Sequence, residues 1–452
     1  MTNSLHERVA EFRRRPRRAL FRLALPTVTA MAVQTTYNMV DTAFVGRLGA
    51  TSLAALTFSF PLYFILVSAN AGMGVGLNSL ISRCLGAGDQ PAAENSAAHG
   101  LLVALVTATV LFLAGLWGSE PLFRLLGARG EALRLAVHYL WIIVGGNFFV
   151  FPAYAIHSIF TAQGDTLTPM KVQITALVAN MVLDPLFIFY FHLGVPGAAA
   201  ATVIAQATGL SLFVYFLRQR SQLRPSWRRF TWKPGIIGEI FRVGVPASLT
   251  MLLMSFYIMV INRLMAHFGI NYVAAFGMVY RLESVVIMPL VASAISLLTI
   301  TGMFYGAGDY PLVRRIIRFG MAVNISYALG ISLLFFCLPT FFLRVFTPDA
   351  RLLELGGAYL RIEVFTFPLA AVNITTNRAL QGLGRGVPGI TINFVRIFVV
   401  AIPLAYVFVF LCRFSYLSIA AAMVAGGLAA NLTALTWLKI VFTGLRRAKE
   451  NK

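Results

Sequence analysis

The chain has 452 residues, of which 58% are hydrophobic and 12% charged, and its 37 Lys and Arg against 16 Asp and Glu give a formal net charge of +21. A soluble globular protein carries about twice this charged fraction, so the composition excludes a disordered chain and argues against a soluble multidomain enzyme. A nucleic-acid-binding protein would need an exposed basic face on a soluble domain, whereas here the basic residues separate long apolar runs. We therefore expect a protein with many membrane spans and no nucleic-acid partner.

Twelve stretches of the chain are long and apolar enough to cross a bilayer, which takes about 20 apolar residues per helix. They lie approximately at 21–45, 53–82, 95–117, 132–161, 170–192, 196–218, 241–266, 272–304, 314–337, 357–381, 388–411 and 417–443. Short separators with turn-forming residues stand between them, such as Gly86-Ala87-Gly88-Asp89. Because a helix satisfies its backbone hydrogen bonds internally, the sequence predicts an all-α integral membrane protein with twelve transmembrane helices.

The basic residues divide the chain and set its orientation in the membrane. They concentrate in the N-terminal tail, after the sixth span and at the C-terminus, which twelve spans place on one side. Since Lys and Arg accumulate on the cytoplasmic side, we expect both termini in the cytoplasm and a multi-pass protein of the inner or plasma membrane. These basic segments also suit contact with anionic membrane lipids. The predicted parts are a basic tail at 1–20, a six-helix bundle at 21–219, a cytoplasmic linker at 220–240, a second six-helix bundle at 241–445 and a tail at 446–452.

The two halves of the chain repeat one another. Residues 21–89 align without a gap with 241–309 at a constant offset of 220, and both segments end in Gly-Ala-Gly-Asp. Six spans per half is an even number, so both halves enter the membrane from the same side and the repeats are parallel. Such repeats build transporters whose substrate site lies between or inside the halves and is reached by alternating access. The sequence therefore predicts two pseudo-symmetric bundles in a transporter.

Four acidic residues lie inside the predicted spans, where an ionisable group is costly and indicates function. They are Asp41, Asp184, Glu283 and Glu363. Each glutamate has an arginine two residues away, a spacing that does not bring side chains onto one helix face. We therefore expect the glutamates to form ion pairs across helices or to serve at the membrane interface. Three arginines of the second half either pair with them or line a polar cavity: Arg263, Arg378 and Arg396.

Asp41 and Asp184 differ from the glutamates, because neither has Lys or Arg three or four residues away. Asn180 precedes Asp184 by four residues and shares its helix face, and Thr202 begins the next span after a tight turn. At about 1.5 Å per residue, Asp41, Asp184 and Thr202 lie roughly 7, 15 and 9 Å from the outer ends of their spans. All four residues therefore belong to the outer half of the first bundle.

This set of oxygen ligands has a definite chemistry. Two carboxylates, an amide oxygen and a hydroxyl suit a desolvated Na⁺, and a carboxylate pair in a low dielectric suits a proton equally well. The alternative is a set of isolated polar residues satisfied by water. The aligned positions of the second half are apolar, which favours an ion site in the first bundle alone.

Further residues of the first half complete the candidate site. Pro26 lies inside span one and either bends that helix permanently or acts as a hinge. The candidate residues for a drug cavity or for support of the site are Gln34, Tyr37, Asn38, Tyr139 and His157, the last of which is alternatively a histidine satisfied within the bundle. Small residues at Gly72, Gly74 and Gly76 indicate close helix packing and not a nucleotide site, because no strand precedes them.

Ordered motifs along nearly the whole chain resemble those of the MATE (multidrug and toxic compound extrusion) transporters. They are Pro26, Asn38-Met39-Val40-Asp41-Thr42-Ala43-Phe44-Val45-Gly46, Gly86-Ala87-Gly88-Asp89, Gln163-Gly164-Asp165-Thr166, Asn180-Met181-Val182-Leu183-Asp184-Pro185, Gly197-Ala198-Ala199-Ala200-Ala201-Thr202 and Gln381-Gly382. The resemblance implies two six-helix bundles in a V-shaped arrangement that export organic cations in exchange for Na⁺ or H⁺. In the branch with acids in the first bundle, the DinF type, the ion-site residues match Asp41, Asn180, Asp184 and Thr202. The branch with a second-bundle site has acids in spans seven and ten, and this sequence lacks an acid in span seven.

We therefore expect a secondary antiporter, and not an enzyme, that exports amphipathic organic cations in exchange for Na⁺ or H⁺ through Asp41 and Asp184. It should be a monomer that contacts small-molecule substrates and membrane lipids and needs no cofactor besides the coupling ion. The alternative is a flippase of lipid-linked precursors or polysaccharides from the same superfamily, and the second-half arginines keep it open. A membrane enzyme would need a polar cluster at a membrane surface, and the sequence shows none.

Overall fold

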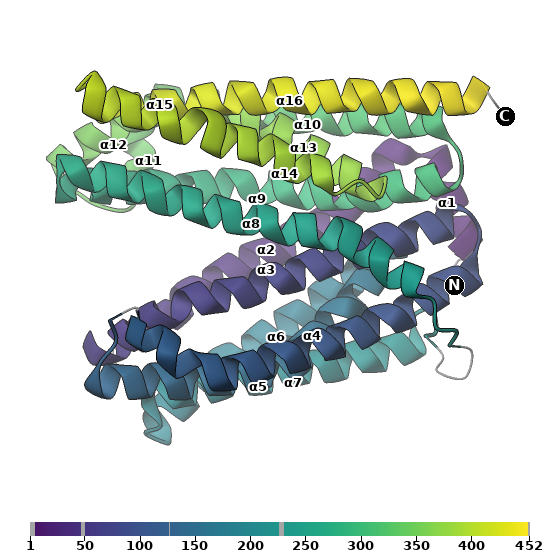
Figure 1. Cartoon of the computed structure of the whole chain (residues 1–452), viewed down its shortest axis with the longest axis horizontal. Coiled ribbons are helices and arrows are strands. Elements are labelled where there is room, and N and C mark those ends of the chain that lie inside the picture. The colour runs from purple at the N-terminus through teal and green to yellow at the C-terminus, as the bar shows by residue number, and fades with distance from the viewer. Residues whose placement is uncertain (1–4, 47–49, 126, 226–229, 451–452) are drawn as a thin grey trace. The chain divides into compact units, whose positions relative to one another are not determined.

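The computed structural model describes residues 5–46, 50–125, 127–225 and 230–450, without the side chains of 38–58 and 447–450 (Figure 1). All regular elements in these ranges are helical, which confirms the predicted all-α fold. Within the described residues, ten helices are long and apolar enough to span a membrane, and one bent pair of helices brings the number to eleven. The remaining predicted span lies in α2 (Pro16–Gly46), whose side chains are described only as far as Tyr37.

Two compact units divide the chain: residues 1–10 with 25–248, and residues 11–24 with 249–452. The helices of the first half of the chain are α1 (Leu5–Arg14), α2, α3 (Ala50–Gly86), α4 (Gln90–Leu125), α5 (Gly130–Ala162), α6 (Leu167–Pro185), η1 (Leu186–Tyr190) and α7 (Gly194–Gln219). Those of the second half are α8 (Pro234–Phe268), α9 (Ile270–Gly306), α10 (Tyr310–Cys337), α11 (Pro339–Leu343), α12 (Ala350–Glu363), α13 (Thr366–Gly382), α14 (Val387–Phe394), η3 (Val395–Ala401), α15 (Ile402–Tyr406), η4 (Val407–Leu411) and α16 (Leu417–Glu450). In the second unit, α16 packs along α13 and η3 (Figure 1).

Three described helices pass from one unit to the other: α1 between residues 10 and 11, α2 and α8. In α2 and α8 a proline lies close to that point. The division falls between residues 24 and 25 of α2 and between residues 248 and 249 of α8. Pro26 and Pro246 lie inside these helices, within three residues of the division. Because a proline removes one helical hydrogen bond, α2 and α8 each lack one backbone hydrogen bond close to the point where they pass from one unit to the other.

The repeated Gly-Ala-Gly-Asp motifs form equivalent turns, as the sequence predicts. Gly88 and Gly308 have φ angles of 77° and 70°, a left-handed conformation that glycine adopts without steric cost. The Oδ1 atoms of Asp89 and Asp309 then accept hydrogen bonds from backbone amides three residues later, at 2.9 and 3.2 Å. Each aspartate therefore caps the following helix, so the motif is a structural stop and start signal in both halves.

The glycines of α3 permit a backbone-to-backbone contact with α8 inside the first unit. A Cβ atom built on Gly76 would lie 2.2 Å from the carbonyl oxygen of Ile240, and one on Gly72 would lie 2.4 Å from that of Gly244. No real side-chain carbon approaches a carbonyl oxygen so closely. The predicted close packing is confirmed, and it fixes the first half of α8 against α3.

The tenth span differs from the uninterrupted helix predicted at 357–381. It consists of α12 and α13, which meet at a bend of 50°. Pro368 lacks the amide that would bond to the carbonyl of Val364 in a continuous helix, and that carbonyl accepts the Ser332 hydroxyl at 2.8 Å and the Phe367 amide at 3.3 Å. Glu363, the last residue of α12, therefore lies directly at the break.

Candidate functional site

A chain of buried hydrogen bonds joins α2 to α6 in the first unit. The Tyr37 hydroxyl donates to Oδ1 of Asn180, and Nδ2 of Asn180 donates to Oδ1 of Asp184 at 2.8 Å. The three residues are 8%, 3% and 0% exposed. Nearer the start of α6, Nε2 of Gln173 donates to Oε1 of Gln34 at 3.2 Å, so the two helices meet at two polar points.

Local sequence explains why Asp184 lies where it does. Asn180 and Asp184 are four residues apart on α6, so their side chains share one face. Pro185 ends α6, and the chain continues directly into the π-helical segment η1. Such segments are rare and occur frequently at functional sites. The carboxylate is therefore held at an irregular point of the fifth span, out of contact with solvent.

The structure brings some predicted site residues together and leaves others apart. Thr202 on α7 is half-buried, and its hydroxyl donates to the carbonyl of Ala198 in its own helix at 2.9 Å. Tyr139, on α5, packs against an apolar cluster of the first unit. His157, also on α5, stacks on Tyr154 with ring centres 5.1 Å apart and packs edge-on against Phe213.

Two predicted residues lie outside the described side chains. They are Asn38 and Asp41, both of which belong to α2. Asp41 follows Tyr37 by four residues, which is about one helical turn. The described part of the site therefore consists of Tyr37, Asn180 and Asp184, and Asp41 stays a prediction.

The sequence groups Tyr37 with residues of a drug cavity or its support, and the structure adds a hydrogen bond from its hydroxyl to Asn180, one of the predicted ion-site residues. Its signal was its position four residues before Asp41, on the same face of one helix. The oxygens of Asp184 and Asn180 are hard ligands of the kind that could hold Na⁺, and the carboxylate could equally hold a proton.

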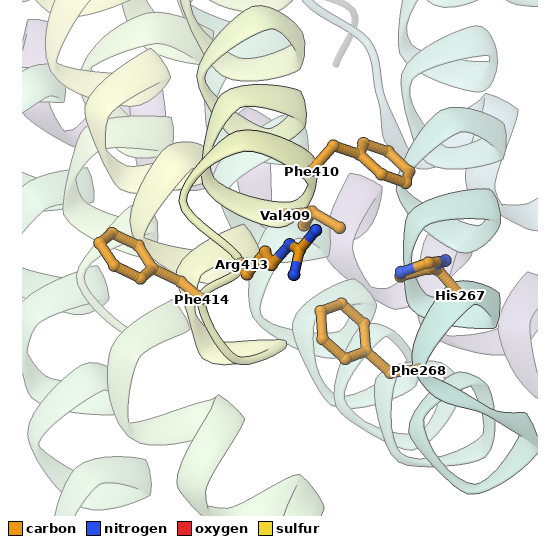
Figure 2. Close-up of a pocket in the computed structure, with 6 residues that line it drawn as sticks. All are labelled: His267, Phe268, Val409, Phe410, Arg413 and Phe414. Carbon is orange, nitrogen blue, oxygen red and sulfur yellow. The ribbon is translucent and has the colours of Figure 1, made fainter.

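A separate pocket opens in the second unit (Figure 2). It has a volume of about 410 Å³ and is lined by the end of α8 and the chain around η4: His267, Phe268, Val409, Phe410, Arg413 and Phe414. The His267 and Phe410 rings lie 5.0 Å apart, and Arg413 extends toward the side on which His267 lies (Figure 2). The positive charge of Arg413 disfavours an organic cation here, and none of the predicted site residues lines this pocket.

The internal repeat and the buried acid of the first unit can now be compared with known proteins. A sequence profile of the MatE family matches residues 26–186 and again residues 246–407. The chain belongs to the MatE family. The two matches begin 220 residues apart, the offset that the internal repeat predicts. Each repeat of this chain therefore corresponds to one copy of the segment that the family profile describes.

Relatives of this MatE protein cover almost its whole length. It is 27% identical over 439 residues to the "Probable multidrug resistance protein NorM" of Thermotoga maritima, covering 94% of this chain and 92% of that one. It is 29% identical over 401 residues to the "FAD transporter" of Shewanella oneidensis, covering 86% and 87%. The crystal structure of a MATE protein in the bent conformation matches with a TM-score of 0.92, at 27% identity and over 99% of both chains.

These findings confirm the family and the transporter class that the motifs predict. The MatE protein is a multi-pass membrane protein with relatives in multidrug efflux.

Proposed function

We propose that this MatE protein is a secondary antiporter of the DinF-type branch that exports amphipathic organic cations in exchange for Na⁺ or H⁺. The coupling ion would bind at Asp41, Asn180, Asp184 and Thr202. The observation that carries the proposal is the buried chain from Tyr37 through Asn180 to the fully buried Asp184. A buried carboxylate is costly unless a cation or a proton neutralises it. Binding or release of that cation or proton at Asp184 therefore changes the stability of the conformation in which the carboxylate is buried.

This property provides a coupling mechanism. In the inward-facing state, the ion leaves Asp41 and Asp184 and an organic cation binds in its place. In the outward-facing state, Na⁺ or H⁺ returns from outside, neutralises the carboxylates and displaces the drug. Each ion biases an equilibrium between two states by its difference in affinity for them.

The hydrogen bonds support a proton more directly than Na⁺. Oδ1 of Asn180 already accepts the Tyr37 hydroxyl, so Na⁺ would have to share the amide oxygen with a hydrogen-bond donor that competes for its electron density. Protonation of Asp184 leaves the bond between Tyr37 and Asn180 intact. We therefore expect H⁺ to drive efflux, with Na⁺ as the alternative that the same assay measures.

Pro26 and Pro246 provide the hinge in this proposal. Both lie where a continuous helix passes from one unit to the other, and a bend there needs to break no further helical hydrogen bond. The relation of Pro26 to the site is also direct, because α2 carries Pro26, Tyr37 and Asp41.

The deciding experiment is efflux of ethidium from proteoliposomes under an imposed proton gradient, compared with an imposed Na⁺ gradient. We expect Asp184→Asn to abolish gradient-driven efflux while the protein is still inserted and monodisperse. Glu120→Gln is the matched control, because Glu120 is exposed and pairs with Arg124 on the surface of the first unit. Efflux that neither gradient drives in the unmodified protein, or that survives in Asp184→Asn, would rule out this coupling site.

The flippase alternative receives no support from the second-half arginines. Arg263 is exposed, Arg378 donates to Oε1 of Gln381 at 3.1 Å, and Arg396 lies beside two acids. They do not form one cationic cavity. Because one relative is named as an FAD transporter, FAD belongs in the substrate panel beside the organic cations.

The orientation is also part of the proposal. The basic N-terminal tail, the basic segment between α7 and α8 and the basic C-terminus support cytoplasmic termini in an inner or plasma membrane. We expect the transporter to act as a monomer without a cofactor other than its coupling ion. Protease accessibility of terminal tags in inside-out vesicles tests the orientation.

A further inference from the structure

The pocket at the end of α8 combines a positive charge with an apolar surface (Figure 2). Arg413 lies in the turn between η4 and α16, and its guanidinium points toward the space among the rings of His267, Phe268 and Phe410. A volume of about 410 Å³ is within the range of small-ligand sites. We call this space the Arg413 pocket, and the proposed coupling mechanism does not use it.

The charge of Arg413 has no acidic partner among the described residues. The ion pairs found there join other arginines to their acids. The start of α12 belongs to the same end of the second unit, because the Tyr416 hydroxyl donates to a backbone carbonyl of α12 at 3.0 Å. Two acids lie there, and both have partners: Glu354 pairs with Arg351 at 3.8 Å, and Asp349 caps α12. The guanidinium of Arg413 is therefore available to an anionic ligand.

The backbone at Arg413 has a conformation that suits glycine. Its φ angle is 51°, and His192 in the first half has the equivalent value of 54°. In both turns the amide before this residue bonds to the first residue of the preceding π-helical segment at 2.9 Å, so the turn imposes the conformation. A cation at the end of a helix also complements the helix dipole, but an arginine with an ordinary backbone would do so equally well. An arginine at a position that is costly for any side chain indicates that its guanidinium is used.

The Arg413 pocket lies at the membrane boundary on the side opposite the basic segment between α7 and α8. After that segment, α8 crosses the membrane once and ends at Phe268, and the eleventh span ends at Leu411. Tyr406, Phe410 and Leu411 of this span have exposed apolar side chains directly before Arg413. The cation therefore stands beside a surface that faces hydrocarbon, at the depth of lipid headgroups.

This combination selects one class of ligand. A guanidinium binds phosphate through two parallel N–H donors, and a neutral His267 imidazole offers one more. Soluble phosphate would leave the exposed apolar side chains without a partner, whereas a phospholipid places acyl chains against them. The ammonium group of a zwitterionic lipid would need an acid, and the described acids at this end already have partners.

We infer that the Arg413 pocket binds the phosphate group of an anionic phospholipid, with phosphatidylglycerol as the simplest representative. Arg413 holds the phosphate, and the acyl chains lie along Phe410 and the neighbouring apolar side chains of the eleventh span. The site is separate from the basic segments at the other end of the spans. Its place in the outer leaflet rests on the proposed orientation, but the binding itself depends neither on that orientation nor on the proposed coupling site.

The test is thermal unfolding of the full-length protein in dodecyl maltoside, titrated with dioctanoyl phosphatidylglycerol. A ligand that binds the folded state raises the Tm with concentration, so the titration gives a Kd. Dioctanoyl phosphatidylethanolamine and inorganic phosphate are the comparison probes, and we expect neither to raise the Tm at the concentration at which phosphatidylglycerol saturates. No saturable rise with phosphatidylglycerol overturns the inference. Equal binding of phosphatidylethanolamine overturns the anionic class, and equal binding of inorganic phosphate overturns the lipid.

Variants locate the binding. Arg413→Gln should weaken phosphatidylglycerol binding by about tenfold, because it removes hydrogen bonds between charged groups. Arg413→Gly should do the same with a residue that fits the left-handed backbone, so loss of binding there is not a consequence of strain.

Two controls match these variants. Arg344→Gln removes an exposed cation that follows α11 and does not line the pocket, and His192→Gly makes the same backbone change in the first half. Both should bind phosphatidylglycerol as the unmodified protein does. Unchanged binding in both Arg413 variants, or an equal loss in Arg344→Gln, overturns the assignment to this pocket.

Discussion

Replacing Tyr37 by phenylalanine tests whether the buried chain holds the first-unit site together. The substitution removes the hydroxyl that donates to Oδ1 of Asn180, and Asn180 is only 3% exposed, so bulk water does not reach the oxygen to replace the donor. A buried acceptor left unsatisfied costs about 1–3 kcal/mol. In a domain of roughly 150–250 residues, 1 kcal/mol changes the unfolding midpoint by about 2–4 °C. We therefore expect the Tm to fall by about 2–12 °C.

The assay is thermal unfolding in nanodiscs at neutral pH without Na⁺, followed by intrinsic fluorescence. Tyr190→Phe is the matched control, because Tyr190 on η1 is 73% exposed and loses only a solvated hydroxyl. Its Tm should change by less than about 2 °C, as surface substitutions stay within about 0.5 kcal/mol. Equal shifts in the two variants would refute the reasoning that the buried hydroxyl supports the site.

The same variant separates the two coupling ions. If Na⁺ uses Oδ1 of Asn180, Tyr37→Phe removes a competing hydrogen bond with a net value of about 0.5–1.5 kcal/mol, which corresponds to roughly two- to tenfold tighter binding. The measurement is the dependence of Tm on Na⁺ concentration, with K⁺ as the control. With H⁺ as the coupling ion, Na⁺ should have no specific effect in either protein. Weaker Na⁺ binding in Tyr37→Phe would contradict the competition and make the hydroxyl itself an ion ligand.

Three further predictions concern coupling, hinging and packing. Asp184→Asn should reduce gradient-driven ethidium efflux to the level of empty liposomes, and a response to either gradient above that level would contradict its role. Pro26→Ala restores the amide that a proline lacks, so the initial efflux rate should fall while the Tm holds or rises; an unchanged rate would remove the hinge from the proposal. Gly76→Val places side-chain atoms against the Ile240 carbonyl, where even a Cβ would lie at 2.2 Å, so stability should fall by about 1–3 kcal/mol or more. Its control is Gly118→Val, because nothing lies within 4 Å of the added Cβ; similar Tm values for the two valine variants would show that α3 and α8 do not pack as described.

The sequence predicted the structure correctly where the membrane leaves the backbone only one way to satisfy its hydrogen bonds. Apolar length, turn residues and the offset of 220 predicted the helical spans and the repeat, because a chain in hydrocarbon must bond its own backbone. The same reasoning singled out Asp184 and Asn180, since a four-residue spacing on one helix places them on one face. It did not predict the hydrogen bond from Tyr37 to Asn180, because a bond between α2 and α6 depends on how the two helices pack and not on spacing within either of them.

By itself, then, the sequence determined the all-helical membrane fold, the duplication and the scarcity of acids inside it. Only the tertiary structure decided which polar or charged side chains lie near each of those acids. The tenth span breaks after Glu363, and the eleventh becomes π-helical around Arg396. At the first of these irregularities, the Ser332 hydroxyl from α10 donates to the Val364 carbonyl at 2.8 Å, a contact between helices that the pattern of residues within the tenth span does not predict. The charge of a buried site depends on such long-range neighbours, so the sequence identified the acids while the fold determined which group acts on each of them.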